Sequence, residues 1–282
     1  MSYIEISNLD YGFADPIALR QKGLELADQY RSAQPYPHIV IDDFVTPAVL
    51  DACLADFPVA PKPDSDSFNR AQERFKTSYN PDHLTPRVRS FFYALNSRPM
   101  LDFLYNITGF KGLLPDPHFV GGGFHQTSQG GHLNVHADFN LHPLLQIERR
   151  LNIILYLNRD WRLEYGGALE LWDREMKACV KQIEPVFNRC VIFSTDATSY
   201  HGHPVPVQHP QGMPRRSIAL YYYTATWDGT RRAFTSQFKR RRNTQDRPDW
   251  QVRAYELIDD LTPPILSRSL LNLARRLQRP SN

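Results

Sequence analysis

The spacing of apolar residues divides the chain into a helical first third and a β-rich middle. In the first third, apolar positions recur every three or four residues, and this period predicts helices because such positions share one helix face. The segments predicted in this part are helices over about residues 16–30, 48–56 and 86–107, and a strand over residues 38–41. Pro99 lies inside the longest helical pattern, so we expect a kink or a break there. Residues 58–69 are rich in Pro, Asp and Ser, which predicts an exposed loop.

From residue 118 the pattern changes to short β-branched and aromatic runs separated by Gly, Pro, Asn and Asp. These runs cover residues 118–124, 132–139, 150–158, 166–173, 190–194 and 216–224. Short strands with turn residues between them are typical of a sandwich or jelly roll rather than of a parallel sheet. The Gly-rich stretch 121–132 predicts a loop at the rim of any site in this region, with His125 and His132 as polar loop residues.

Together these patterns predict a mainly β protein with flanking helices, whose core is a jelly roll (a double-stranded β-helix). An N-terminal α/β segment over residues 1–117 is expected to pack on a β core over residues 118–226. A polar, basic tail follows over residues 227–282. Apolar residues at helical spacing between Ile265 and Leu277 predict a helix at the end of this tail.

Charge separates the tail from the rest of the chain. The 282 residues include 33 Lys and Arg and 30 Asp and Glu, a net charge of +3. Residues 227–282 contain 12 basic and 6 acidic residues, which leaves 21 basic and 24 acidic residues, a net charge of −3, for residues 1–226. A nucleic-acid ligand is therefore not expected for the body of the protein. The basic run 239–242 is the segment that could contact an anionic partner or surface.

The sequence also restricts the cellular environment. No apolar run approaches the roughly 18 residues of a membrane span, and the N-terminus does not resemble a secretory signal. Cysteines are three in number and form no CxxC pair, which argues against a disulfide framework and predicts a reducing cytoplasm.

Histidine is the residue whose distribution indicates chemistry, because eight of the ten histidines fall between His118 and His209. In the segment HAD, His136 and Asp138 are two residues apart and project from the same face of a strand. His201 follows a predicted strand 63 residues later and could supply a third ligand. Two histidines and one carboxylate form the facial triad of non-heme Fe(II) oxygenases. Taken without His201, the pair His136 and Asp138 is better interpreted as a structural hydrogen-bonded pair at a strand end.

A guanidinium at the start of the last β run suggests that this site also binds an anion. Arg215 and Arg216 are adjacent there, and a strand sends adjacent side chains to opposite faces. The planar, permanently charged fork of arginine matches a carboxylate with two hydrogen bonds.

In this order, the motifs resemble the Fe(II)- and 2-oxoglutarate-dependent dioxygenases, and within them the prolyl-4-hydroxylase-like group. The motifs are HAD at 136–138, YLN at 156–158, GGALELW at 166–172, His201 and Arg215. The resemblance implies that His136, Asp138 and His201 hold Fe(II), and that Arg215 and Tyr156 bind the distal carboxylate of 2-oxoglutarate. Asn152 lies on the same strand face as Tyr156 and is a further cofactor-binding candidate.

Two of these assignments have alternatives in the sequence. His203 lies on the same face of an extended segment as His201, and the residues around His201 match the family better. Arg216 competes with Arg215, which is favoured because Ser217, a small residue, follows two positions later.

The activity implied by the resemblance is hydroxylation of an unactivated C–H bond, with conversion of 2-oxoglutarate and O2 to succinate and CO2. The intact Asp138 favours hydroxylation or desaturation over halogenation, because halogenating relatives replace this carboxylate with a small residue. The substrate could be a protein residue such as a prolyl group, or a small molecule such as a sugar. The alternative is a cupin-like metal enzyme that does not use 2-oxoglutarate. Against it, cupins usually carry three histidines and a glutamate, and Arg215 would then have no anion to bind.

Overall fold

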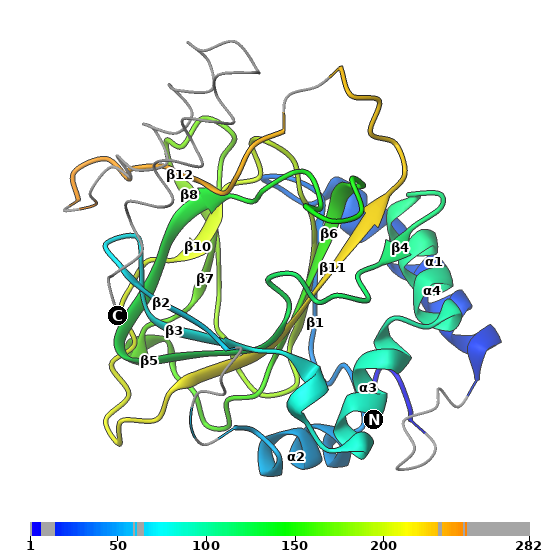
Figure 1. Cartoon of the computed structure of the whole chain (residues 1–282), viewed down its shortest axis with the longest axis horizontal. Helices are drawn as coiled ribbons and strands as arrows, with labels where there is room; N and C mark the ends of the chain where they lie inside the picture. Colours follow the sequence, from blue (N-terminus) through cyan, green and yellow to red (C-terminus); the bar gives the residue numbers. More distant parts are fainter. Residues whose placement is uncertain are drawn as a thin grey trace.

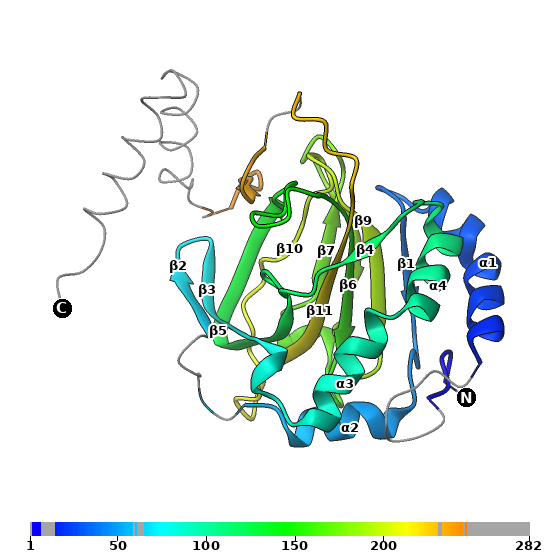
Figure 2. The same ribbon diagram turned by 45° about the vertical axis from the view of Figure 1, so that its right-hand side comes forward.

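A computed structural model describes residues 2–6, 15–58, 60, 65–230, 233–244 and 246. In these residues, antiparallel strands curl into a half-barrel, and helices cover one outer face of it (Figures 1 and 2). The predicted mainly β jelly roll with flanking helices is therefore confirmed. The helix predicted at the end of the basic tail lies outside the described residues.

The order of elements follows the two halves of the sequence pattern. The helices are α1 (Pro16–Ser32), α2 (Pro47–Ala55), α3 (Pro86–Leu95) and α4 (Arg98–Thr108), with short 3-10 turns at Pro81–His83 and Leu163–Tyr165. The strands are β1 (His38–Ile41), β2 (Asp66–Arg70), β3 (Glu73–Tyr79), β4 (Leu114–Pro115), β5 (Gly123–Ala137), β6 (Glu148–Tyr156), β7 (Leu169–Trp172), β8 (Cys179–Ile183), β9 (Cys190–Ser194), β10 (His201–His203), β11 (Arg215–Thr224) and β12 (Gln237–Phe238). The third predicted helix is split into α3 and α4, and Pro99 lies in the first turn of α4, where its missing N–H has no cost. No helix in these described segments is long and apolar enough to cross a membrane.

The long strand β5 links the two walls of the half-barrel. The main path of the sheet runs β1-β9-β6-β11-β5-β10-β7-β8, and the neighbouring strands pair antiparallel. The first part of β5 pairs with β11, where Phe124 faces Ile218. Its last part pairs with β10, where His136 faces His201. Because one strand serves both partners in succession, the sheet curls around an interior space.

Alternation along β6 separates this interior from the hydrophobic core. Leu151, Ile153 and Leu155 are buried in the large core cluster that includes the helices. The intervening residues Asn152 and Ile154 face the interior of the half-barrel. A strand buried on both faces explains why this run reads as continuously apolar with an isolated asparagine.

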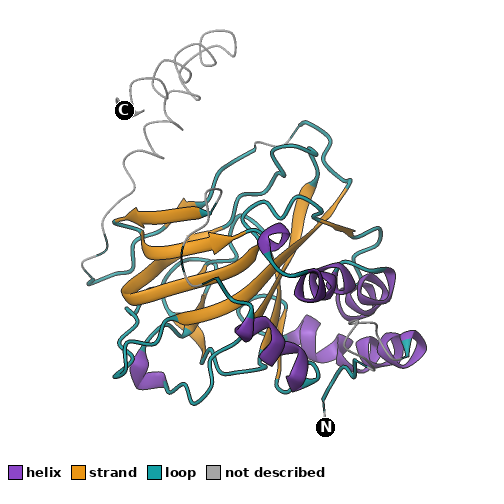
Figure 3. Cartoon of the chain, turned by 60° about the horizontal axis from the view of Figure 1, so that its bottom comes forward, coloured by secondary structure: helices purple, strands orange, loops and turns teal. Residues whose placement is uncertain are grey.

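Figure 3 shows the strands as a curled sheet with most of the helices beside it. Two loop predictions were wrong for the residues that form strands in this sheet. Most of the Gly-rich stretch 121–132 belongs to β5, and the predicted loop 58–69 leads into β2 from residue 66. The hairpin β2–β3 lies along β5 and pairs with it through β3. The glycines mark a close approach of strands instead of a loop, since a Cβ at Gly131 would lie 2.6 Å from the Arg74 carbonyl oxygen.

Candidate functional site

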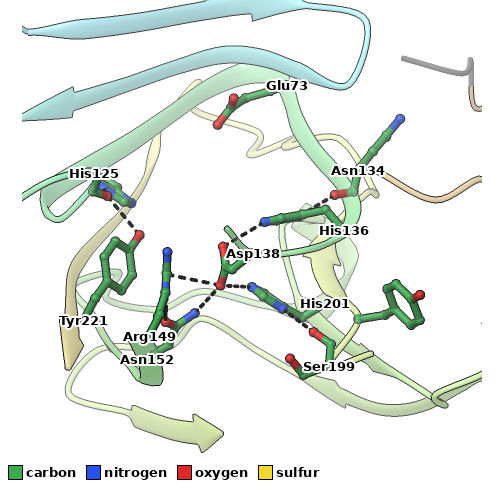
Figure 4. Close-up of polar contacts among 12 residues, drawn as sticks. Glu73, His125, Asn134, His136, Asp138, Arg149, Asn152, Ser199, His201 and Tyr221 are labelled. Atoms are coloured by element: carbon green, nitrogen blue, oxygen red, sulfur yellow. Dashed lines mark hydrogen bonds and ion pairs between the residues drawn. The ribbon is translucent and has the colours of Figure 1, made fainter. Parts of the chain in front are cut away.

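Two histidines and an aspartate come together inside the half-barrel. His136 is the penultimate residue of β5, Asp138 follows directly after this strand, and His201 opens β10. Because His201 lies opposite His136 in the antiparallel pair, their side chains enter the same space (Figure 4). One ligand atom from each of the three residues lies within 4.8 Å of the other two, and all three residues are buried.

Backbone carbonyl groups orient both imidazole rings. His136 Nδ1 donates to the Asn134 carbonyl and His201 Nδ1 donates to the Ser199 carbonyl, each over 2.9 Å. A carbonyl oxygen only accepts, so each Nδ1 carries the proton and each Nε2 keeps a lone pair. The Nε2 atoms lie 3.5 Å (His136) and 3.3 Å (His201) from the Asp138 carboxylate oxygens. This is the arrangement that prepares histidines as metal ligands.

The Asp138 carboxylate is held in its charged form from the other side. Its Oδ2 accepts a 2.7 Å hydrogen bond from Asn152 Nδ2 and lies 3.1 Å from Arg149 Nη2. Burial alone raises the pKa of the Asp138 carboxyl, but Arg149 and His201 hold its pKa well below the ordinary value. The aspartate therefore stays ionised, as a metal ligand must be.

Arg149 is a site residue that the sequence analysis missed. Its Nε and Nη2 donate to Asn152 Oδ1 over 3.0 and 2.7 Å, and its guanidinium lies 3.5 Å from the centre of the Tyr221 ring. Strict alternation would place Arg149 on the opposite face of β6 from Asn152. The pairing of β6 with β11 shifts register at this point, with Leu151 opposite Tyr222 and Arg149 opposite Tyr223. This β-bulge turns Arg149 toward the carboxylate.

Arg215 is a buried cation whose hydrogen bonds involve no acidic group. Its Nε donates to the Gly167 carbonyl over 2.7 Å, and its Nη2 donates to the Tyr156 hydroxyl over 3.3 Å. Among the described residues no carboxylate pairs with it, and burial lowers its pKa. Gly167 has φ of +69°, and a Cβ there would lie 2.9 Å from Arg215 Cδ, so glycine is required where the guanidinium passes. An unpaired buried guanidinium fits an anionic ligand.

Arg216 lies on the other face of β11, as alternation requires. Its Nε donates to Gln126 Oε1 over 3.1 Å, and its guanidinium stacks 4.6 Å from the centre of the Phe57 ring. It does not line the cavity that Arg215 enters. His203 does enter this cavity but is not part of the group formed by His136, Asp138 and His201.

A single cavity of about 240 Å³ connects these groups. The residues that line it include the metal-type cluster (His136, Asp138 and His201), Arg215, Asn152, His203 and Lys76. Its charged lining residues are the cations Arg70, Lys76, Arg149 and Arg215 and the carboxylates Glu73 and Asp138. The cavity is thus electropositive, which suits uptake of a dicarboxylate.

Two further residues line the cavity although the sequence did not predict them there. His125, predicted as a polar loop residue, is buried in β5, lines the cavity and bonds the Gly121 carbonyl through Nε2 over 2.9 Å. Phe238, in the predicted basic tail, belongs to β12, which pairs with the end of β5. Its ring lies 5.1 Å from that of His136, centre to centre. An isolated phenylalanine in a basic segment gave no signal in the sequence.

The fold and the site define a jelly-roll protein in which a buried His-Asp-His cluster and a buried arginine line one cavity. Residues 122–223 match the model of the 2OG-Fe(II) oxygenase superfamily. The solved structures similar to this chain include a prolyl hydroxylase from Trichoplax adhaerens, in complex with a hypoxia inducible factor peptide, and a Pseudomonas putida prolyl-4-hydroxylase. The first is 18% identical, with a TM-score of 0.54 and coverage of 73% of this chain and 90% of that chain. The second is 14% identical, with a TM-score of 0.50 and coverage of 72% and 98%. No protein of curated function matches the sequence.

Residues 122–223 thus have the sequence pattern of the 2OG-Fe(II) oxygenase superfamily, and the chain has the fold of the prolyl hydroxylases to which it is similar. The match and the site together support a 2-oxoglutarate-dependent oxygenase. The donor set of two imidazoles and one carboxylate fits Fe(II), and Arg215 with Tyr156 fits a carboxylate of 2-oxoglutarate. The match favours this class over the cupin-like alternative.

Proposed function

We propose that the protein hydroxylates an unactivated C–H bond of its substrate. When bound, Fe(II) and 2-oxoglutarate supply the oxidising chemistry: O2 and 2-oxoglutarate are consumed, succinate and CO2 are released, and one oxygen atom goes to the substrate. The chain's own residues bind and orient these groups and shield the reaction from water.

In this proposal His136, Asp138 and His201 hold the metal. Arg215 and Tyr156 bind the distal carboxylate of 2-oxoglutarate, one by charge and the other through its hydroxyl. Asn152 lines the same cavity and stays a predicted cofactor-binding residue. It also positions Asp138, whose Oδ2 accepts a 2.7 Å hydrogen bond from its Nδ2.

The observation that carries this proposal is that a His-Asp-His cluster and a buried arginine line one cavity. The histidine Nε2 atoms converge on Asp138, and a buried arginine without an acidic partner among the described residues lines the same space. A metal cluster alone would also suit a hydrolase, but the arginine requires an anion nearby. A dicarboxylate that binds the metal at one end satisfies both.

The substrate is proposed to be either a residue of a protein, such as a prolyl group, or a small molecule such as a sugar. The fold of the prolyl hydroxylases is compatible with the first class. Neutral and anionic candidates of both classes can be ranked by how far they raise succinate formation above the rate without substrate.

The experiment is a turnover assay of the purified full-length chain with Fe(II), ascorbate, O2 and 2-oxoglutarate. We expect succinate to form with the unmodified protein. With His136→Ala the rate should fall by more than about 100-fold, because losing even a group that supports a ligand costs about 10- to 100-fold in metal affinity. Succinate is quantified by mass spectrometry.

The matched control is His118→Ala, which removes an exposed histidine that does not line the cavity. Its succinate yield should equal that of the unmodified protein. Unchanged turnover in His136→Ala, or no turnover and no 2-oxoglutarate binding in the unmodified protein, contradicts the proposed function.

A further inference from the structure

His203 is a buried histidine that makes no hydrogen bond in the described part of the structure. Its side chain lies in the cavity lined by Arg215, and the residue is 3% exposed. Its Nδ1 is buried without a partner. The histidines of the metal-type cluster differ in this respect, because the Nδ1 atoms of His136 and His201 both bond backbone carbonyls.

A buried polar atom without a partner is costly unless a ligand or water satisfies it. His203 follows His201 by two residues on β10. The pairing of β10 with β5 shifts register between them, and both side chains nevertheless line the cavity. An imidazole carries at least one N–H whichever ring nitrogen holds the proton, so His203 has a hydrogen bond to donate. Its side chain lines the same cavity as Arg215.

His203 is neither a potential metal ligand like His201 nor hydrogen-bonded to a described residue of the protein. It is not in the group of potential metal ligands, and no carboxylate, hydroxyl or backbone group of the described residues bonds it. Since none of the described residues supplies an acceptor, a bound ligand is the partner left for this ring. The acceptor that the neighbouring Arg215 also requires is a carboxylate.

We infer that His203 is a further co-substrate-binding residue, which donates a hydrogen bond to the same carboxylate of 2-oxoglutarate that Arg215 binds. The inference rests on the proposed function, because it takes 2-oxoglutarate as the ligand of Arg215. It predicts that His203 contributes to affinity for the distal carboxylate and not to affinity for the metal. It also explains why this position is a histidine. An apolar side chain could pack there without leaving a buried polar atom unpaired, as His203 Nδ1 is.

The test compares two 2-oxo acids on protein loaded with Mn²⁺, in which no turnover occurs. 2-Oxoglutarate carries the distal carboxylate, and 2-oxopentanoate has a methyl group in its place. His203→Val should weaken 2-oxoglutarate binding by about 10- to 100-fold, as expected for loss of a hydrogen bond to a charged group. The Kd of 2-oxopentanoate and the Kd of Mn²⁺ should stay within about twofold of the unmodified values.

His203→Asn keeps an N–H donor and should recover part of the 2-oxoglutarate affinity, which also covers the case in which His203→Val does not fold. Calorimetric titration gives all the dissociation constants. Equal losses for both acids would indicate a packing role, and a loss of Mn²⁺ affinity would make His203 a metal ligand; either result overturns the inference. So does an unchanged Kd for 2-oxoglutarate. If the unmodified protein binds no 2-oxoglutarate, the proposed function itself fails, and the two failures are thereby distinguished.

Discussion

Replacement of Arg215 by alanine is expected to weaken 2-oxoglutarate binding by roughly 100- to 1,000-fold, with little change in metal affinity. Within the described part of the chain, the buried guanidinium bonds only the Gly167 carbonyl and the Tyr156 hydroxyl, so the incoming carboxylate would bring it a charged partner. Removal of one member of a buried, hydrogen-bonded charge pair costs about 2 to 5 kcal/mol. Calorimetric titration of the Mn²⁺-loaded variant with 2-oxoglutarate measures the effect.

Arg216→Ala is the matched control for this prediction. It removes the neighbouring arginine, which bonds Gln126 and stacks on Phe57 outside the cavity, so the Kd for 2-oxoglutarate should stay within about twofold. Arg215→Lys should fall between the two, since an ammonium keeps the charge but not the planar fork. If Arg216→Ala loses the affinity and Arg215→Ala does not, the assignment of the anion site is wrong.

A second large effect is expected when Asp138 is removed, because this leaves a buried cation without its partner. Asp138→Ala should abolish tight metal binding and, in metal-free protein, lower the free energy of unfolding by about 3 to 5 kcal/mol. The double variant Asp138→Ala/Arg149→Met should regain most of this stability, since a methionine of similar length removes the unpaired charge. It should not regain metal binding. Urea unfolding with a chelator present, followed by Mn²⁺ titration, separates the two effects.

Asp51→Ala provides a surface comparison, because Asp51 pairs with Arg159 where both side chains are about half exposed. Its effect on the free energy of unfolding should stay below about 1 kcal/mol. If Asp138→Ala/Arg149→Met is as unstable as Asp138→Ala alone, the unpaired charge of Arg149 is not the source of the instability.

Strand periodicity predicted much of this site. The alternation that groups Asn152 with Tyr156 depends only on the backbone period of two, and the structure keeps it along that part of β6. The same period separates Arg215 from Arg216, which the structure places inside and outside the cavity. Such inferences hold wherever the strand is regular.

The features that the sequence did not predict arise from departures from that regularity and from long-range pairing. The bulge opposite Tyr222 and Tyr223 brings Arg149 to the aspartate, and no local signal marks it. Glycines in 121–132 suggested a loop, but Gly131 instead permits close packing of β3 on β5. Phe238 reaches His136 only because β12 adds to the end of β5, a contact about 100 residues apart in sequence.

The most direct test of the account is an anaerobic titration of metal-free protein with Fe(II) and 2-oxoglutarate, followed by visible absorption. If His136, Asp138 and His201 hold the metal and 2-oxoglutarate chelates it, a metal-to-ligand charge-transfer band should appear only when both are present. The band should saturate near one equivalent of Fe(II) and be absent in His136→Ala. A protein that binds 2-oxoglutarate equally well with and without metal, or that shows no band with both, would contradict the account.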